Sequence, residues 1–524
     1  MGGIGSGALP QYYWMVIVAI IIGFIYAFGI GANDVANSFG SSVASKALSL
    51  GQAIIAASIF EFLGAILLGQ SVTGTIRGGI LKSSYYEDAP ELLMYGMLNS
   101  LIIGSAWLLT ATYLEMPVST THTIVAAIIG FSLAVEGFES VNWKETGKIF
   151  ICWVAAPSLA GAIAFIFFFC VKSFVFQPGF TKDETFRRGL MAYPVVIFVG
   201  ITINVAFIVL KAQGKIAEKR KITDYGTRVA LPAALGSGVV SAIITVFFVN
   251  PYLKHKVTRD HEEHEEVLRQ EKEDADAAEA ALKEQGDDAG EGGEEKNKDT
   301  TVEERTQKGS LHQAWDWFAD NTFRQDLEAQ SFASSKRAKE IWDASEQHDP
   351  MTERLFSYLQ VFTACLTAFA HGSNDVANSI APLAAVLEIQ QTGELPSKSA
   401  VAKWLLALGG AGICFGFLFF GYRTLRALGY KLTAITPSRG FCIELSTSLS
   451  VLIASYLSIP VSTTQCLVGA TVGAGVASGG LKSVQWLFLL RTTFGWAGIF
   501  FVACVCSCGF FAYCTYSPSV VEVV

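Results

Sequence analysis

Two eight-residue stretches decide the fold of this chain: GANDVANS at residues 31–38 and GSNDVANS at residues 372–379. Each is followed by a second matched motif, PVSTTH at 117–122 and PVSTTQ at 460–465. Two unrelated polar motifs that recur in the same order indicate an internal repeat. Such repeats are typical of secondary transporters, in which the binding site lies between the two halves near the middle of the bilayer.

The spacing of the motifs supports the repeat. Asp34 precedes Ser119 by 85 residues, and Asp375 precedes Ser462 by 87 residues. Two different motifs that recur in the same order at nearly the same spacing are very unlikely to arise by chance.

The composition places most of the chain in a membrane. Of 524 residues, 51% are hydrophobic and only 16% are charged, whereas a soluble protein carries about 25% charged residues. A membrane-crossing helix needs about 20 apolar residues. Apolar runs of this kind predict an all-α integral membrane protein and lie at about 12–32, 51–70, 91–114, 145–171, 190–212, 227–250, 355–389, 402–421, 441–459 and 484–514.

A hydrophilic insert separates the two membrane halves. We predict a first membrane repeat at 1–171, additional transmembrane helices at 172–253, the insert at 254–353 and a second repeat at 354–524. The insert begins with an acidic stretch poor in aromatic residues, which is typical of a partly disordered linker. Its later part, from Trp315 to Trp342, predicts one or two short helices. Much of the net charge of −8 arises in this insert, and no basic patch indicates a nucleic-acid partner.

The Asn-Asp-x-x-Asn element predicts a cation site. An ionised side chain in a membrane segment is costly and by default marks a function, and carboxylate and amide oxygens are ligands for hard cations. Na⁺ is the favoured ion, with a proton carried by the Asp as the alternative. We expect Gly29, Gly31 and Gly372 to break the helices locally and free backbone carbonyls. The candidate ligands are Asn33, Asp34, Asn37, Asn374, Asp375 and Asn378.

The Pro-Val-Ser-Thr-Thr element predicts the start of a short helix, with Pro in its first turn and hydroxyl caps. The apolar stretches that follow, 124–133 and 466–476, are short for a full crossing and favour half-helices or re-entrant hairpins. A helix N-terminus attracts anions through its free N–H groups and its dipole. The hydroxyls of both copies predict a donor-rich cradle for an oxyanion: Ser119, Thr120, Thr121, Ser462, Thr463 and Thr464.

These motifs together resemble the inorganic phosphate transporter (PiT) family of sodium–phosphate symporters. The resemblance implies an inverted-repeat fold of about twelve membrane segments, counting re-entrant hairpins, and often a homodimer. It implies that the six hydroxyl residues contact phosphate and that the Asn and Asp residues bind Na⁺ or support the site. Glu61 and Glu444 are similar to intramembrane glutamates of that family, which implies a role in gating or coupling.

The expected function is import of inorganic phosphate by alternating access, with two Na⁺ carried per H₂PO₄⁻. No resident cofactor is expected, and no nucleophile–base set indicates an enzyme. The alternatives are a transporter for another oxyanion such as sulfate, a proton-coupled phosphate symporter, and a phosphate-sensing receptor.

The expected location is the plasma membrane. The resemblance implies that the insert is cytoplasmic, whereas the positive-inside rule also favours the cytoplasm for the basic segment 211–228. A single crossing at 227–250 would place the two on opposite sides.

Overall fold

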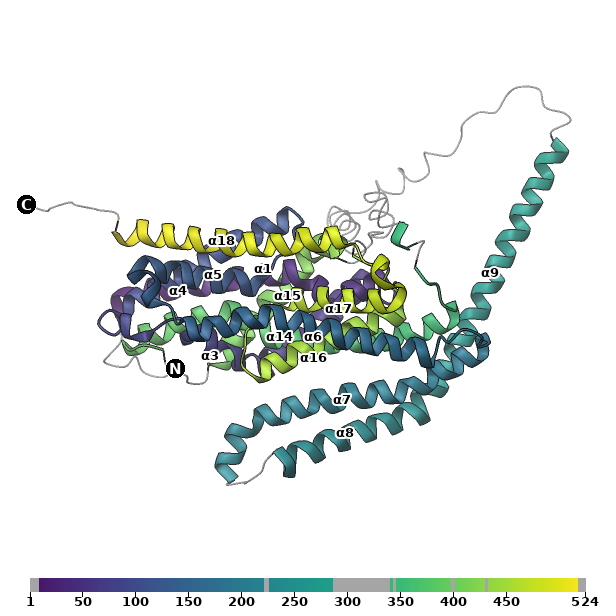
Figure 1. The fold of residues 1–524 in the computed structure, drawn as a ribbon, viewed down its shortest axis with the longest axis horizontal. Helices are drawn as coiled ribbons and strands as arrows, with labels where there is room; N and C mark the ends of the chain where they lie inside the picture. Colours follow the sequence, from purple (N-terminus) through teal and green to yellow (C-terminus); the bar gives the residue numbers. More distant parts are fainter. Residues whose placement is uncertain are drawn as a thin grey trace, which may run out of the picture.

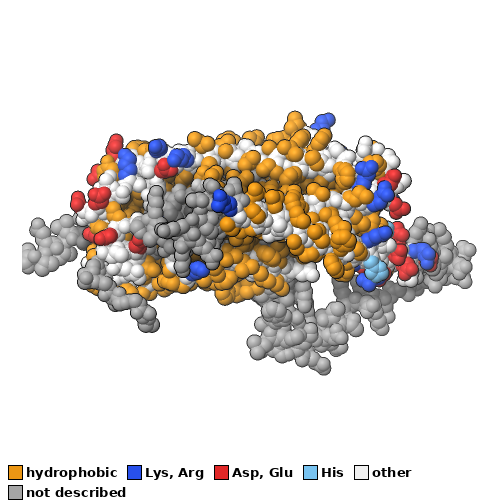
Figure 2. Space-filling model, turned by 90° about the horizontal axis from the view of Figure 1, so that it is seen from below, with side chains coloured by type: hydrophobic (Ala, Val, Ile, Leu, Met, Phe, Trp, Pro, Cys, Tyr) orange, Lys and Arg blue, Asp and Glu red, His pale blue; other side chains and the backbone are white. Residues whose placement is uncertain are grey.

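The fold is built almost entirely of helices. The computed structural model describes residues 9–220, 226–285, 340–342, 345–396, 401–428 and 432–516. Nine helices within these ranges are long and apolar enough to cross a membrane. Figure 2 shows the apolar surface as a broad band, with the charged side chains gathered toward the two ends of the molecule. The predicted all-α membrane fold is therefore confirmed, while the count of about twelve segments stays a prediction.

The described residues form helices on both sides of the insert. The helices are α1 (Tyr13–Ala44), α2 (Leu50–Leu68), α3 (Gln70–Gly78), α4 (Pro90–Tyr113), α5 (Thr120–Glu136), α6 (Trp143–Phe174), α7 (Lys182–Arg220), α8 (Leu231–Ile244), α9 (Asn250–Gln285), α14 (Pro350–Thr392), α15 (Lys403–Leu428), α16 (Pro437–Tyr456), α17 (Thr463–Gly479) and α18 (Trp486–Tyr516). In Figure 1, α1 to α6 and α14 to α18 form one bundle, α7 and α8 lie beside it, and α9 extends away from it.

The two helices that carry the Asn-Asp motifs run antiparallel. At one end the backbone N–H of Leu9 donates to the carbonyl of Gln390, at 2.8 Å. At the other end the Ser45 hydroxyl donates to the side chain of Gln360, at 2.6 Å. The motif-bearing segments of α1 and α14 therefore point in opposite directions. This supports the expected inverted relation of the two halves, which stays a prediction for the halves as wholes.

Glycines bring the halves together instead of breaking their helices. The expectation of a local break is wrong, because α1 and α14 run without interruption through both motifs. The absence of a side chain lets α1 cross α15 and α14 cross α2 at backbone contact, as is common between membrane helices. An added Cβ would lie between 1.9 and 2.2 Å from a facing carbonyl oxygen at four positions: Gly31 against Ile413, Gly416 against Phe28, Gly372 against Glu61 and Gly64 against Phe369.

The Pro-Val-Ser-Thr-Thr motifs do begin short helices, each 17 residues long. Ser119 is the N-cap of α5, and its side chain accepts from the backbone N–H of His122. Ser462 caps α17 in the same way through Gln465. The expectation that Pro lies in the first turn is wrong, because each Pro stands two residues before the capping Ser. The Ser hydroxyl satisfies a free N–H group of the first turn, and the helix begins after it.

The insert lies largely outside the described residues, which omit 286–339, 343–344 and most of the Trp315–Trp342 segment. Where the chain returns to the bundle, Glu346 pairs with Lys172 of α6 at 2.5 Å, and the His348 ring stacks on Phe176 at 4.0 Å. Burial and the nearby Arg439 lower the pKa of His348 to about 4. The chain is thus fixed to the bundle just before α14. The division into four regions stays a prediction.

The glycine crossings make a first prediction. Gly31→Ala places a methyl group against the backbone of α15, so we expect it to lower stability by about 1–3 kcal/mol or more. Gly236→Ala in α8 is the matched control, because an added Cβ there meets no atom within 4 Å. Thermal unfolding of both variants in detergent would measure the difference. Equal melting temperatures for the two variants would show that the crossing is not close-packed.

Candidate functional site

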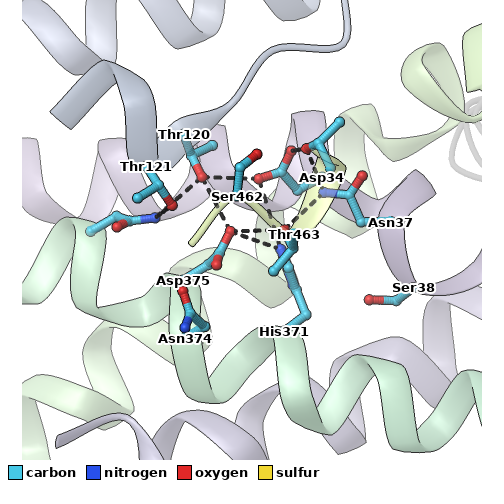
Figure 3. Close-up of polar contacts among 12 residues, drawn as sticks. Asp34, Asn37, Ser38, Thr120, Thr121, His371, Asn374, Asp375, Ser462 and Thr463 are labelled. Atoms are coloured by element: carbon cyan, nitrogen blue, oxygen red, sulfur yellow. Dashed lines mark hydrogen bonds and ion pairs between the residues drawn. The ribbon is translucent and has the colours of Figure 1, made fainter. Parts of the chain in front are cut away.

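Two buried carboxylates occupy the centre of the bundle, where α1 and α14 cross. Asp34 and Asp375 are each 1% exposed. The Thr120 hydroxyl, at the first position of α5, lies 3.1 Å from Asp34 Oδ2 and 3.2 Å from Asp375 Oδ2. Figure 3 shows this hydroxyl between the two acids. The structure therefore brings the acidic residues of both copies into one site.

The hydroxyl motif of each half pairs with the Asn-Asp motif of the other. Asn37 Nδ2 donates to the hydroxyls of Thr463 and Thr464, at 3.2 and 2.9 Å. In the equivalent arrangement, Asn378 Nδ2 donates to the hydroxyls of Thr120 and Thr121, at 3.2 and 3.1 Å. Each asparagine thus reaches across to the helix that begins in the opposite half. Neither half contains a complete site by itself.

Each carboxylate lies within hydrogen-bond distance of threonines from both halves. The Thr464 hydroxyl donates to Asp34 Oδ1 at 3.3 Å, and the Thr463 hydroxyl donates to Asp375 Oδ2 at 3.2 Å. All four threonines of the two motifs are at most 1% exposed. The N-termini of α5 and α17, with their free N–H groups, therefore meet at the two acids.

Four of the expected residues support the site from outside this centre. Asn33 accepts from the backbone N–H of Val118 at 3.0 Å and so holds the segment that precedes α5. Asn374 lies 2.9 Å from the Ser455 hydroxyl. The hydroxyls of Ser119 and Ser462 serve as helix caps. Asn33, Ser119 and Ser462 make no contact with Asp34 or Asp375 among the described residues. Asn374 Nδ2 donates to Asp375 Oδ1 at 3.3 Å when its amide is oriented so that its oxygen accepts from the Ser455 hydroxyl.

One ionisable residue of the site was missed by the sequence analysis. His371 lies one turn before Asp375 on α14, and its Nε2 is 3.2 Å from Asp375 Oδ2 and 3.8 Å from Asp34 Oδ2. Its Nδ1 is 2.7 Å from Glu61, and Glu61 also accepts from the Ser38 hydroxyl at 2.9 Å. The signal was present in the sequence, since His371 is an ionisable side chain inside the apolar run at 355–389.

The Glu61–His371 pair has no polar counterpart in the other crossing. The carbonyl of Glu61 faces Gly372 just as the carbonyl of Ile413 faces Gly31, so Ile413 occupies the position equivalent to Glu61. His371 precedes Gly372, and Ile30 precedes Gly31. Both isoleucines are fully buried. One of two similar crossings therefore carries an ionisable pair, and the other carries an apolar one.

Glu444 lies away from Asp34 and Asp375, in a pocket of its own. One carboxylate oxygen accepts from the hydroxyls of Ser41 and Ser42, each at 2.6 Å, and the other accepts from Thr363 at 2.7 Å. Gln360 Nε2 donates to the first of these oxygens, Oε1, at 3.2 Å. Because these donors come from α1 and α14, Glu444 links α16 to both motif helices.

The site also contains oxygens that are free to bind a cation. The amide oxygens Asn37 Oδ1 and Asn378 Oδ1 are buried and have no hydrogen-bond partner among the described residues. Orphaned buried acceptors are rare, and these two occupy equivalent positions of the repeat. Ligand atoms of Asp34, His371 and Asp375 also lie within 4.8 Å of one another. The arrangement offers carboxylate, amide and hydroxyl oxygens, the donors that hard cations prefer.

Comparison with known proteins gives a consistent result. The model of the phosphate transporter family matches residues 30–507. A putative phosphate permease of Haemophilus influenzae is 33% identical over 473 residues, covering 90% of both chains. Sodium-dependent phosphate transporter 1 of Mus musculus is 30% identical over 658 residues, covering 95% of both chains. A solved structure titled "The sodium-dependent phosphate transporter" aligns with a TM-score of 0.70 and 29% identity, and covers 96% of this chain and all of that one.

The asymmetric pair makes a second prediction. Breaking a buried ion pair by removing one partner costs about 3–5 kcal/mol, whereas replacing both partners with apolar residues is often nearly neutral. We therefore expect Glu61→Ile and His371→Ile each to lower stability strongly. The double variant, which copies the Ile413–Ile30 arrangement, should lose clearly less than the sum of the two. Unfolding in denaturant would measure the coupling, and additive losses would contradict it.

Proposed function

Since this chain belongs to the phosphate transporter family, as its duplicated motifs predicted, we propose that it imports inorganic phosphate by symport with Na⁺. The family is one of transporters, so the chain is not an enzyme. The observation that carries the proposal is the exchange between the halves, in which Asn37 binds the hydroxyls of Thr463 and Thr464 and Asn378 binds those of Thr120 and Thr121. This exchange assembles one polar site inside an apolar bundle.

We assign phosphate to the threonine side of this site. The hydroxyls of Thr120, Thr121, Thr463 and Thr464 and the N-termini of α5 and α17 supply neutral donors for its oxygens. Ser119 and Ser462 hold these N-termini in place as caps. No Arg lies among the described contacts of these threonines. A bidentate Arg would bind phosphate tightly, whereas a transporter must release it, so hydroxyl donors suit the task.

We assign one Na⁺ to each copy of the Asn-Asp motif. The first site would use a carboxylate oxygen of Asp34 and the free amide oxygen of Asn37, and the second would use Asp375 and Asn378. Asn33 and Asn374 would position the surrounding segments. Two Na⁺ with one H₂PO₄⁻ carry one positive charge inward. A negative interior then favours uptake by about 2.3 kcal/mol per 100 mV.

Transport through this site requires alternating access. Asp34, Asp375 and the four threonines are at most 1% exposed, so bulk water reaches none of them in this arrangement. The helices must therefore separate first on one side and then on the other. Glu444 joins α16 to α1 and α14, and Glu61 joins α2 to His371, so we assign both glutamates to coupling or gating.

Three further assignments follow from the family likeness. We propose that the protein lies in the plasma membrane, that the insert is cytoplasmic, and that two copies form a homodimer. The candidate span Arg228–Val267 crosses between the α7–α8 connection and the insert. A cytoplasmic insert therefore places that connection, despite its basic residues, on the outer side.

Proton coupling is the second candidate, and a specific observation favours testing it. His371 contacts Glu61 and Asp375, and this group of three could carry a proton across in place of one Na⁺. The two forms of coupling differ in which imposed gradient drives uptake.

The cation sites make a third prediction. In proteoliposomes, an inward Na⁺ gradient should drive phosphate uptake, and Asp34→Asn or Asp375→Asn should reduce the Na⁺-driven rate by about tenfold or more, since each loses an ionised ligand. Glu139→Gln is the control, because that side chain is 80% exposed. Uptake driven only by a proton gradient would replace Na⁺ with H⁺ in the mechanism. Unchanged coupling in both Asp variants would contradict the assignment of these sites.

The substrate makes a fourth prediction. The protonated oxygens of H₂PO₄⁻ can donate to Asp34 and Asp375, whereas sulfate at neutral pH has no proton to donate and would meet the two acids as an unpaired anion. Excess unlabelled sulfate should therefore leave uptake of labelled phosphate nearly unchanged, and arsenate, which has the same protons, should compete. Equal competition by sulfate and arsenate would show that the site selects shape and charge alone.

A further inference from the structure

A crevice of about 880 Å³ opens on the side of the bundle between α6, α17 and α18. Its rim is exposed and apolar, with Val154 at 70% and Phe165 at 40% exposure. Because these helices are candidate spans or lie between them, the rim faces the hydrocarbon of the bilayer. The size is that of a site for one small ligand.

Close packing at the floor of the crevice creates this space. An added Cβ on Gly469 would lie 2.1 Å from the Pro157 carbonyl, and one on Gly473 would lie 2.0 Å from the carbonyl of Gly161. α6 and α17 therefore touch backbone to backbone. α18 instead packs on α5, where Ser507 donates to the Ala127 carbonyl at 2.6 Å. The crevice lies between the three helices, and aromatic rings of Phe150, Trp153 and Phe500 form one wall.

Three residues that line the crevice carry buried polar atoms with no partner among the described residues. They are Trp153 Nε1, Trp496 Nε1 and Gln465 Oε1. Gln465 is 7% exposed and Trp496 is 6% exposed, so neither polar atom is satisfied by bulk water. A buried tryptophan N–H or amide oxygen usually finds a partner. Two donors and one acceptor left open around a single crevice indicate a ligand that can both accept and donate.

The lining restricts the chemistry of that ligand. None of the described residues that line the crevice is Asp, Glu, Lys or Arg, so a charged lipid headgroup would lack a counter-charge. An acyl chain would leave the two indole N–H groups and the amide oxygen unsatisfied. One hydroxyl on a rigid apolar body meets all of these conditions, since a hydroxyl both donates and accepts, and a flat ring system packs against aromatic walls.

We propose that this crevice is a sterol-binding site, with the sterol hydroxyl between the indole N–H groups and Gln465. The site adjoins the transport pocket. Gln465 Nε2 lies 3.2 Å from His122 Nε2, and the His122 ring stacks on Trp153 at 3.6 Å. Gln465 and His122 directly follow the two Pro-Val-Ser-Thr-Thr motifs, so their contact joins the first turns of α17 and α5. A bound sterol would rest against this joint.

The test uses the purified full-length protein in nanodiscs with a diazirine-bearing cholesterol analogue. We expect labelling of crevice residues that excess unlabelled cholesterol displaces. Val154→Trp should fill the crevice and reduce displaceable labelling by about tenfold. Ile151→Trp is the matched control, because Ile151 is 69% exposed on the same helix but does not line the crevice. If Val154→Trp does not fold, Ala497→Trp fills the same space from α18.

The hydroxyl contact has its own control. Trp496→Phe removes one unpartnered N–H and should weaken displacement about three- to tenfold. Trp486→Phe, whose N–H already donates to the Leu481 carbonyl, should leave it unchanged. Cholesterol should also raise the melting temperature of the wild type but not of Val154→Trp, because a ligand stabilises only the state that it binds.

Three outcomes would overturn the proposal. The first is labelling that cholesterol does not displace, or that Val154→Trp and Ile151→Trp reduce equally. The second is equal displacement by phosphatidylcholine, which would make the occupant ordinary bilayer lipid. The third is Val154→Cys crosslinking between two copies of the chain without any crevice labelling, which would make this face a dimer interface.

Discussion

The burial of Asp34 and Asp375 at the crossing of α1 and α14 is the constraint on which the rest of the structure depends. Even after relaxation, removing a carboxylate from water costs several kcal/mol. The protein offsets this cost with threonine hydroxyls, the N-termini of α5 and α17, and the His371 ring. All of these groups must lie within a few ångströms of the two carboxylates. The short helices therefore begin at the centre of the bundle, and glycines allow the long helices to approach closely enough.

The exchange of partners between the halves makes the site a property of the whole chain. Among the described residues, the Nδ2 group of Asn37 in the first half donates only to threonines of the second, and that of Asn378 only to threonines of the first. Relative movement of the halves would break both sets of contacts at once. These hydrogen bonds complete the pocket, and they also depend on how the two halves are arranged. A carrier needs this dependence if ligand binding is to control its opening.

The sequence predicted the helical membrane fold and the meeting of the two motif pairs, because duplicated polar residues in apolar runs have few other uses. It did not predict which of the motif residues contact the same partners. Asn33 and Asn37 are one turn apart on α1, yet one holds the loop before α5 and the other binds threonines of the opposite half. The glycines were expected to break helices, and the structure uses them for crossings. His371 was missed because its partner Glu61 lies 310 residues away.

Two departures from symmetry, Glu444 with its donors and the Glu61–His371 pair, lie toward one end of the pocket. Since α1 and α14 run antiparallel, the later part of α1 and the early part of α14 meet at the same end. There Glu444 is surrounded by Ser41, Ser42, Gln360 and Thr363.

The matching positions of the repeat carry no such polar groups. The offset between Ser119 and Ser462 (462 − 119 = 343) pairs Glu444 with Leu101. The offset between Asp34 and Asp375 (375 − 34 = 341) pairs its four donors with residues that are all apolar: Pro382, Leu383, Ala19 and Ile22.

Ile413 and Ile30 likewise replace Glu61 and His371 on the other side. A fully symmetric pocket would present the same surroundings to both ends of the bundle and would distinguish them only through the gradients outside. Here one end is lined by buried polar side chains and the other by buried apolar ones. The free energy of opening must therefore differ between the two ends, because exposing Glu444 and its donors to water costs far less than exposing buried leucine and isoleucine. The two repeats form the binding pocket, and the differences between them make its two ends unequal in polarity.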